Sequence, residues 1–151
     1  MPATELTSAL EHTHPGLALD LACGAGRHAI WLRDRGWRVT AVDQAAPSLE
    51  GITCIQADLE RGEFRILPNA WDLIVCWLYW QEDLLAPIVA GVRQGGIAAL
   101  AGKTTGRFAT SLANYRRAFK GWEEIASGEP DCRAFWIGRK SGWIGRKSGG
   151  P

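Results

Sequence analysis

Three aspartates stand at or near the ends of predicted β-strands. Asp20 lies in an apolar run that ends at Ala22, and Asp43 and Asp58 directly follow the next two predicted strands. Ligands of open α/β sheets lie beyond the carboxyl ends of the strands, so we expect the three side chains to face one site. A carboxylate at Asp43 can accept both hydroxyls of a ribose, and one at Asp58 can accept a hydrogen bond from an adenine amino group. The acids therefore predict a site for a nucleoside-containing ligand.

A glycine turn follows the first predicted strand. Gly24 and Gly26 allow the backbone to approach a ligand closely, and the helix that begins at Arg27 offers free N–H groups to an anion such as a carboxylate. The run 24–29 also fits the dinucleotide fingerprint with alanine in its last place, so a nicotinamide-dependent oxidoreductase is an alternative. Asp20 argues against that alternative, because a buried carboxylate here would repel a pyrophosphate and would suit a cationic amine.

Alternating apolar strands and amphipathic helices must position these residues. Near-continuous apolar strands indicate a mostly parallel sheet covered on both faces, and a closing hairpin adds one antiparallel strand. Only eight residues, 44–51, join the second strand to the third, where parallel connections usually need about a dozen. The strands are predicted at 16–22, 37–42, 52–57, 71–76, 97–101, 122–127 and 132–137, and the helices at 27–35, 84–93 and 111–119.

Length, charge and cysteine usage limit the class of protein. A chain of 151 residues is expected to form one domain, at 1–142, and the residues 143–151 repeat a seven-residue basic segment and are expected to be a flexible tail. The net charge is +1 and no basic face is evident, which speaks against nucleic acid as partner. No apolar stretch is long enough for a membrane span and no secretion signal is evident, so a cytoplasmic protein is expected. The four cysteines have no metal-ligand spacing, so no metal is expected, and we interpret them as reduced and mostly buried.

Several motifs of the chain resemble those of class I S-adenosylmethionine-dependent methyltransferases. The Cys-Gly-Ala-Gly-Arg form of the glycine turn is most similar to the tellurite-resistance-type branch of small methyltransferases. The motifs that carry the resemblance are Asp20-Leu-Ala-Cys-Gly-Ala-Gly-Arg27, Ala41-Val-Asp43, Gln56-Ala-Asp58-Leu59, Trp71-Asp-Leu-Ile-Val-Cys76 and Gly95-Gly96.

The resemblance implies an α/β fold, a Rossmann-like three-layer sandwich with a mostly parallel seven-stranded sheet of order 3-2-1-4-5-7-6 and one antiparallel strand near the C-terminus. It implies S-adenosylmethionine as the cofactor and methyl transfer to an acceptor as the reaction. By the same resemblance the cofactor site is lined by Asp20, Ala22, Gly24, Gly26 and Arg27 at the methionine part, Asp43 and Gln44 at the ribose, Asp58 and Leu59 at the adenine, and Cys76 at the sulfonium.

The segment after the fourth strand is the expected acceptor pocket. Trp77, Tyr79 and Trp80 could wall a small molecule, or could equally pack beneath the next helix. This segment lacks the Asp/Asn-Pro-Pro-aromatic motif of nucleic-acid amino methyltransferases, which favours a small-molecule acceptor. No convincing general base is found, and His28 is interpreted as a helix-surface or capping residue. A non-catalytic cofactor-binding or partner-regulating domain of the same fold therefore stays open as a second alternative.

Overall fold

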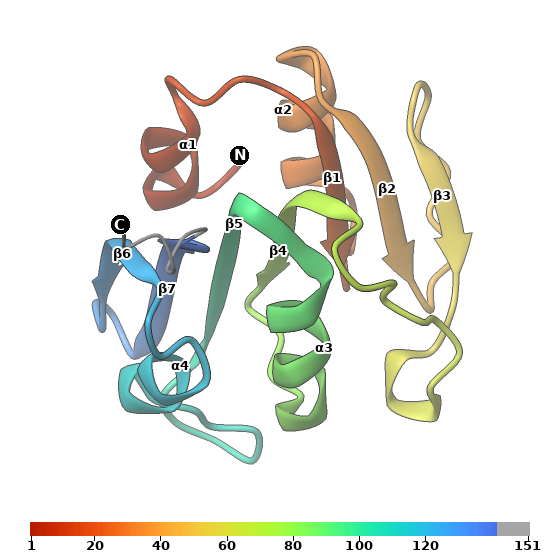
Figure 1. Ribbon diagram of the computed structural model, residues 1–151. Helices are drawn as coiled ribbons and strands as arrows, with labels where there is room; N and C mark the ends of the chain where they lie inside the picture. The colour runs from red at the N-terminus through yellow and green to blue at the C-terminus, as the bar shows by residue number, and fades with distance from the viewer. Residues whose placement is uncertain (142–151) are drawn as a thin grey trace.

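A seven-stranded sheet forms the centre of the molecule (Figure 1). The computed structural model describes residues 1–141, so the predicted tail at 143–151 lies outside the described residues. The strand order is β3-β2-β1-β4-β5-β7-β6, which confirms the predicted fold class and topology. The strands are β1 (Leu17–Leu21), β2 (Arg38–Asp43), β3 (Thr53–Gln56), β4 (Trp71–Trp77), β5 (Val92–Lys103), β6 (Glu123–Gly128) and β7 (Arg133–Arg139).

The first five strands run parallel, and β7 is antiparallel to both of its neighbours. The carboxyl ends of β1, β2 and β4 therefore meet at one edge of the sheet. In Figure 1 this edge lies at the lower side, where the arrowheads of β2 and β3 point. The predicted acids and the glycine turn are thereby brought to the same edge.

Two apolar cores lie on opposite faces of the sheet. One face packs on α1 (Thr4–Leu10) and α2 (Arg27–Asp34), whose buried residues include Leu10 and Leu32. The other face packs on α3 (Leu85–Gly91) and α4 (Leu112–Ala118) through buried residues such as Ile88 and Tyr115. Each strand of the centre is apolar on both sides for this reason, as parallel sheets require.

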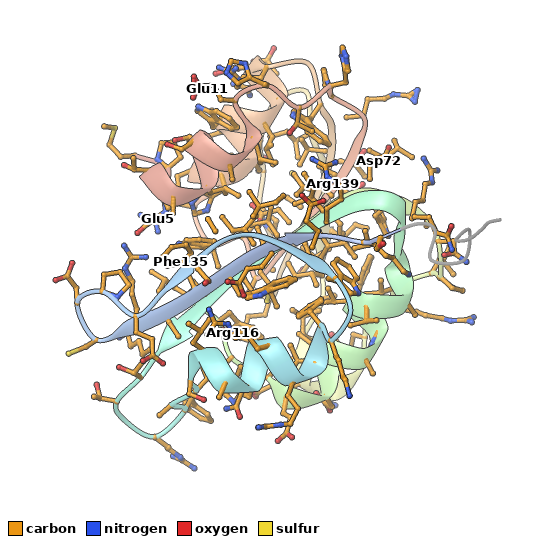
Figure 2. The ribbon with its side chains drawn as sticks, turned by 60° about the vertical axis from the view of Figure 1, so that its left-hand side comes forward. Glu5, Glu11, Asp72, Arg116, Phe135 and Arg139 are labelled. Atoms are coloured by element: carbon orange, nitrogen blue, oxygen red, sulfur yellow. The ribbon has the colours of Figure 1, made fainter. Side chains whose placement is uncertain are left out.

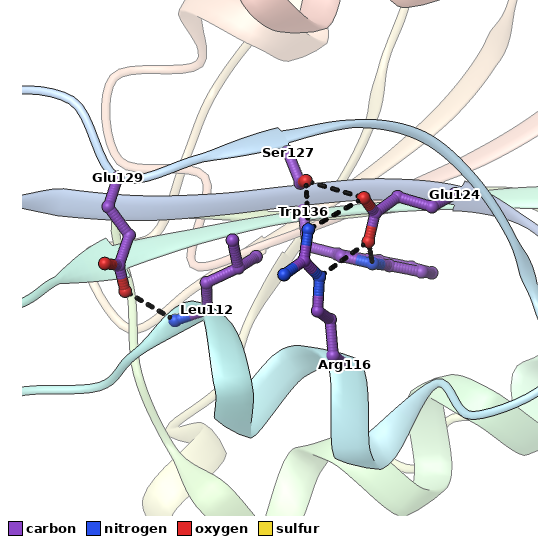
Figure 3. Close-up of polar contacts among 6 residues, drawn as sticks. All are labelled: Leu112, Arg116, Glu124, Ser127, Glu129 and Trp136. Atoms are coloured by element: carbon purple, nitrogen blue, oxygen red, sulfur yellow. Dashed lines mark hydrogen bonds and ion pairs between the residues drawn. The ribbon is translucent and has the colours of Figure 1, made fainter.

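A polar cluster fixes α4 against the hairpin β6–β7 (Figure 3). The Arg116 guanidinium donates to both carboxylate oxygens of Glu124 at 2.9 and 3.0 Å. The Ser127 hydroxyl donates to Glu124 at 2.8 Å, and the indole N–H of Trp136 donates to it at 2.9 Å. Ser111 caps α4 by accepting a hydrogen bond from the Asn114 N–H.

The N-terminal helix α1 was not predicted from the sequence. It is only seven residues long, and it is stabilised by burial of Leu6 and Leu10 and by contacts with distant segments. The Ala3 N–H donates to Nε2 of His28 at 3.1 Å, and Glu5 pairs with Arg133 (Figure 2 shows Glu5 beside the hairpin). Tertiary contacts of this kind leave no local sequence signal.

The crossovers on either side of β3 lack α-helices. Residues 44–51, between β2 and β3, contain turns, and the segment after β3 contains only the 3₁₀ turn η1 (Leu59–Arg61). The eight-residue connection is therefore accommodated without a crossover helix. A second 3₁₀ turn, η2 (Glu82–Leu84), precedes α3. None of the helices in residues 1–141 is sufficiently long and apolar to span a lipid bilayer.

Candidate functional site

The glycine turn after β1 forms the floor of the site. Gly24 and Gly26 have φ angles of 57° and 88°, and Ala22 before them also lies in the left-handed region at 54°. A Cβ on Gly26 would lie 2.4 Å from Cδ1 of Leu49, whereas a Cβ on Gly24 would meet no atom within 4 Å. Gly26 thus serves packing inside the protein, whereas Gly24 is exposed and has open space beside its backbone. Arg27 follows as the exposed first residue of α2.

Asp43 joins this turn to the end of β2. Its Oδ2 accepts a hydrogen bond from the Gly24 N–H at 2.9 Å, and its Oδ1 accepts one from the Ala45 N–H at 2.9 Å. A carboxylate offers about four lone-pair positions, so both oxygens keep capacity for a ligand hydroxyl. The same side chain can therefore order the site and bind in it.

Asp20 is a buried acid with an unused acceptor. Its side chain lies on β1, the residue is 2% exposed, and Oδ2 has no hydrogen-bond partner among the described residues. Burial, with a smaller contribution from the charge of Asp43, raises the pKa of Asp20 to about 7. A cationic group placed here would supply the missing partner.

The first cavity lies at the carboxyl ends of β1, β2 and β4 and has a volume of about 260 Å³. It brings together several residues predicted from separate motifs, from both the cofactor set and the acceptor set. Its lining consists of Ala22, Asp43, Gln44, Ala57, Leu59, Glu60, Leu78 and Tyr79.

Three lining residues of the first cavity were missed from the sequence. Ala57 and Glu60 flank the predicted residues Asp58 and Leu59 in the sequence. Their position next to a predicted strand end could therefore have identified them. Leu78 gave no signal, because it lines the cavity through a left-handed backbone (φ 60°) that leucine rarely adopts. Strained backbone of this kind is concentrated at functional sites.

Other predicted residues lie near this cavity without lining it. The Asp58 carboxylate accepts a hydrogen bond from the Glu60 N–H at 3.0 Å and so caps η1. Cys76 is 2% exposed and lies under the site, where its thiol is packed in the core. Gly24, Gly26 and Arg27 lie in the adjacent turn and helix start, and the cavity lining does not include them.

The assignment of Trp77 to the acceptor pocket is corrected by the structure. Trp77 is 6% exposed and belongs to the core under α1 and α2. Its ring makes an edge contact with His28 at 6.0 Å between centroids and a tilted contact with Phe135 at 6.2 Å. Successive strand residues point to opposite faces, so Trp77 turns away from the face on which Cys76 packs.

A second cavity of about 510 Å³ adjoins the first. Tyr79 and Trp80, two of the residues expected at the acceptor pocket, line this cavity, and the loop after β5 supplies its far wall. The full lining is Glu60, Leu78, Tyr79, Trp80, Lys103, Thr105, Gly106, Arg107 and Phe108. Glu60, Leu78 and Tyr79 belong to both cavities and form their common wall.

Gln81 fixes this common wall. Its Oε1 accepts the Tyr79 hydroxyl hydrogen at 2.7 Å, and its Nε2 donates to the Leu59 carbonyl at 3.1 Å and to Asp83 at 2.7 Å. One amide therefore connects the loop after β4 to η1. Sequence reasoning did not single out Gln81, because a glutamine in a loop is typical of solvent-exposed segments.

Burial keeps three titratable side chains in or near the site neutral. Burial raises the pKa of Tyr79 and of Cys76 to about 12, and burial lowers the pKa of His28 to about 4. His28 is a buried acceptor for the Ala3 N–H, in place of the helix-surface role expected.

The prediction that most cysteines are buried is wrong, because Cys76 alone is buried and the other three are half-buried or exposed. Within residues 1–141 no three His, Cys, Asp or Glu side chains are grouped as a metal site requires.

The comparisons with known proteins agree with this geometry. Residues 2–75 match the family described as Tellurite resistance protein TehB. A malonyl-[acyl-carrier protein] O-methyltransferase of Salmonella typhimurium is 32% identical over 112 residues, covering 68% of this chain and 43% of that protein. The chain therefore spans less than half the length of this curated relative.

Solved structures show the same fold. TehB from Haemophilus influenzae has a TM-score of 0.77 at 16% identity, covering 93% of this chain and 63% of that one. A 1,6-didemethyltoxoflavin-N1-methyltransferase from Burkholderia thailandensis, with bound 1,6-didemethyltoxoflavin and S-adenosylhomocysteine, has a TM-score of 0.67 at 20% identity, covering 91% of this chain and 75% of that one.

Strand order, glycine turn and sequence matches agree in making this chain similar to the class I S-adenosylmethionine-dependent methyltransferases. Within that class, about half of the chain, residues 2–75, is similar to tellurite resistance protein TehB, which confirms the resemblance seen in the glycine turn.

Proposed function

We propose that this chain binds S-adenosylmethionine in the first cavity and transfers its methyl group to a small molecule held in the second. The observation that carries the proposal is the common wall. Glu60, Leu78 and Tyr79 line both cavities, so two ligands bound there would meet across these three residues.

Residues in and beside the first cavity suit the parts of this cofactor. The unused Oδ2 of Asp20 matches an ammonium group, and the open face of Gly24 leaves room for the chain that carries it. The free lone pairs of Asp43 match the ribose hydroxyls. Ala57 and Leu59 offer an apolar surface for the adenine ring.

Bound S-adenosylmethionine would supply an electrophilic methyl group for an in-line displacement. The role of the chain is then to align the acceptor and exclude water, which accounts for much of the rate of such reactions. Tyr79 keeps its proton at neutral pH and is held by Gln81, so it acts as a fixed wall. This arrangement favours an acceptor whose nucleophilic atom is already ionised, such as a thiolate.

The strand order argues against the nicotinamide alternative. Dinucleotide-binding sheets of the Rossmann type have the parallel order 3-2-1-4-5-6, whereas here the antiparallel β7 lies between β5 and β6. The Burkholderia methyltransferase has the same fold as this chain and holds a small molecule together with S-adenosylhomocysteine, which supports a small-molecule acceptor here as well.

Calorimetric titration with S-adenosylhomocysteine tests the cofactor assignment. We expect saturable binding by the native chain, and a loss of about 10- to 100-fold in Asp43→Ala because charged hydrogen bonds to the ribose are removed. Asp43→Asn should recover part of the affinity, and Asp34→Ala, which changes an exposed acid on α2, should match the native chain. Melting curves on the same samples separate lost binding from lost folding.

Two outcomes would contradict the proposal. Tighter binding of NAD than of S-adenosylhomocysteine would favour the oxidoreductase alternative. Normal cofactor binding without S-adenosylhomocysteine release from S-adenosylmethionine, over a panel of thiols, amines and oxyanions, would favour the non-catalytic alternative.

A further inference from the structure

The second cavity carries two cations that form no ion pair with any acid among residues 1–141. Lys103 ends β5 and Arg107 lies in the following loop, and both line this cavity. Within residues 1–141 neither side chain forms an ion pair or a hydrogen bond. By contrast, Arg33, Arg93 and Arg116 elsewhere on the surface each pair with a carboxylate.

The charges are distributed unevenly along the cavity. Lys103 and Arg107 belong to the second cavity alone, whereas Glu60 is its one acidic lining residue and stands at the common wall with the first cavity. A ligand in the second cavity would therefore meet positive charge at one end and the carboxylate at the reacting end. An anion at the first end would relieve the repulsion between two like charges in one cavity.

Aromatic side chains form the remaining walls. Trp80 and Tyr79 stand on one side, and Phe108 lies on the loop beside Arg107, whose guanidinium carbon is 5.4 Å from the ring centroid. Trp80 is held by an edge contact with the buried ring of Tyr115 at 5.6 Å between centroids. Flat aromatic walls of this kind bind planar rings by stacking or edge contacts.

We infer that the methyl acceptor is a planar aromatic acid, with its carboxylate on Lys103 and Arg107 and its nucleophilic atom at the opposite end of the ring, at the wall formed by Glu60 and Tyr79. The inference rests on the proposed function, whose acceptor it specifies. For a thiolate acceptor the step balances without a base, because the sulfur–methyl bond of the sulfonium breaks as the new thioether bond forms. The ring carboxylate takes no part in the displacement.

Three thiophenols that differ only in the para substituent test whether a negative charge is required. They are 4-mercaptobenzoate, its neutral amide 4-mercaptobenzamide, and 4-aminothiophenol, each titrated into the chain saturated with S-adenosylhomocysteine. We expect the acid to bind about fivefold or more tightly than the amide, since two exposed charge contacts are gained. We expect rising salt to weaken the acid alone. The acid should also be the best methyl acceptor with S-adenosylmethionine.

Substitution of Lys103 and Arg107 tests whether these two cations cause the preference for the acid over the amide. Lys103→Gln together with Arg107→Gln should bring the acid to the level of the amide, and should leave amide binding and S-adenosylhomocysteine affinity within about twofold. The matched control Lys120→Gln, an exposed cation after α4 that does not line the cavity, should keep the full preference.

The failures of the two proposals can be told apart. If S-adenosylhomocysteine does not bind the native chain, the proposed function fails. If S-adenosylhomocysteine binds but the acid shows no binding, or binds no better than the amide, or keeps its advantage in the double variant, the acceptor inference alone is overturned.

Discussion

A single buried carboxylate dominates the chemistry of the site at the scale of the residue. Asp20 lies in the apolar centre of the sheet, where ionisation is costly, and the raised pKa of about 7 expresses that cost. In the free protein the neutral form predominates below this pH. A cationic ligand group would favour the ionised form instead, so ligand binding and proton release at Asp20 are linked.

This linkage predicts a pH-dependent affinity for S-adenosylhomocysteine. Between about pH 6 and about pH 7.5 the affinity should rise, by up to about tenfold, because the ionised Asp20 alone can pair with the ligand ammonium. Asp20→Asn should bind more weakly and show a flat profile over the same range in calorimetric titrations. An equal rise in the variant would assign the pH dependence to another group.

The stability of the free chain provides a control with a defined sign. The folded pKa of Asp20 is raised above its ordinary value of 3.8, so its contribution to folding is full below about pH 4 and is lost as pH rises through about 7. Melting temperatures of Asp20→Asn relative to the native chain should therefore be more favourable at about pH 8 than at about pH 4.

The two turn glycines should respond differently to alanine. Gly26→Ala forces a Cβ against Leu49 at a φ of 88°, so we expect the free energy of unfolding to fall by about 2 kcal/mol or more. Gly24→Ala meets open space and costs the backbone strain alone, about 1 kcal/mol, yet it fills the face offered to the ligand. Denaturant titrations should therefore show the larger loss of stability in Gly26→Ala. Titrations with S-adenosylhomocysteine should show that Gly24→Ala loses affinity although its fold is retained. A Gly24→Ala protein with native affinity would place the ligand elsewhere.

At the scale of the element, the cluster of Figure 3 fixes α4 and with it the wall of the second cavity. The pKa of Glu124 is lowered to about 2 by its hydrogen bonds from Arg116, Ser127 and Trp136. A lowered pKa means that this contribution to folding is present above about pH 4.5 and is lost as pH falls toward 2.

Glu124→Gln should lower the melting temperature at neutral pH by a few degrees, equivalent to about 1 kcal/mol after allowance for solvent screening of this partly exposed group. Near pH 3 the difference from the native chain should shrink. Glu123→Gln is the matched control, because its carboxylate is 69% exposed and lies 3.9 Å from Arg139, and it should change the melting temperature little. An equal effect of both variants would show that the cluster adds no specific stability.

The sequence predicted the elements that have a clear local pattern of apolar and turn residues. The order of strands and the closing hairpin follow from apolar runs, turn residues and a resemblance, and both are present in the structure. α1 could not be predicted, because its stability comes from buried leucines and from contacts with His28 and Arg133 far along the chain. β5 also begins at Val92, before the predicted apolar run 97–101, and its residues 93–95 are exposed and so give no apolar pattern.

The site was predictable in part for the same reason. Asp43 and Leu59 follow strand ends and were found by position, whereas Leu78 and Gln81 act through an unusual backbone angle and a side-chain network. Trp77 was misassigned because the end of β4 could not be located to the residue, and one residue changes the face of the sheet.

At the scale of the whole molecule, the two outer sides of the sheet, at β6 and at β3, are packed against the rest of the protein to different extents. At one end the antiparallel hairpin packs on α1 and α4 and is held by the Glu124 cluster. At the other end β3 has four residues, pairs with β2 alone and has no fully buried side chain. No crossover helix covers this side of the sheet, because residues 44–51 contain turns and irregular backbone but no helix.

The weak packing of β3 predicts the order in which backbone amides exchange with deuterium. We expect the amides of β3 to exchange well before those of β1 and β4, because local opening there breaks few apolar contacts. Ligand bound against Ala57 and Leu59 adds its binding free energy to that opening step, so saturating S-adenosylhomocysteine should slow exchange in 53–61 and leave β6 unchanged. Uniform slowing over the whole sheet would instead show that the chain opens as one unit. On this view the bound ligand does for β3 what a crossover helix does elsewhere in the sheet, because it adds contacts that oppose local opening.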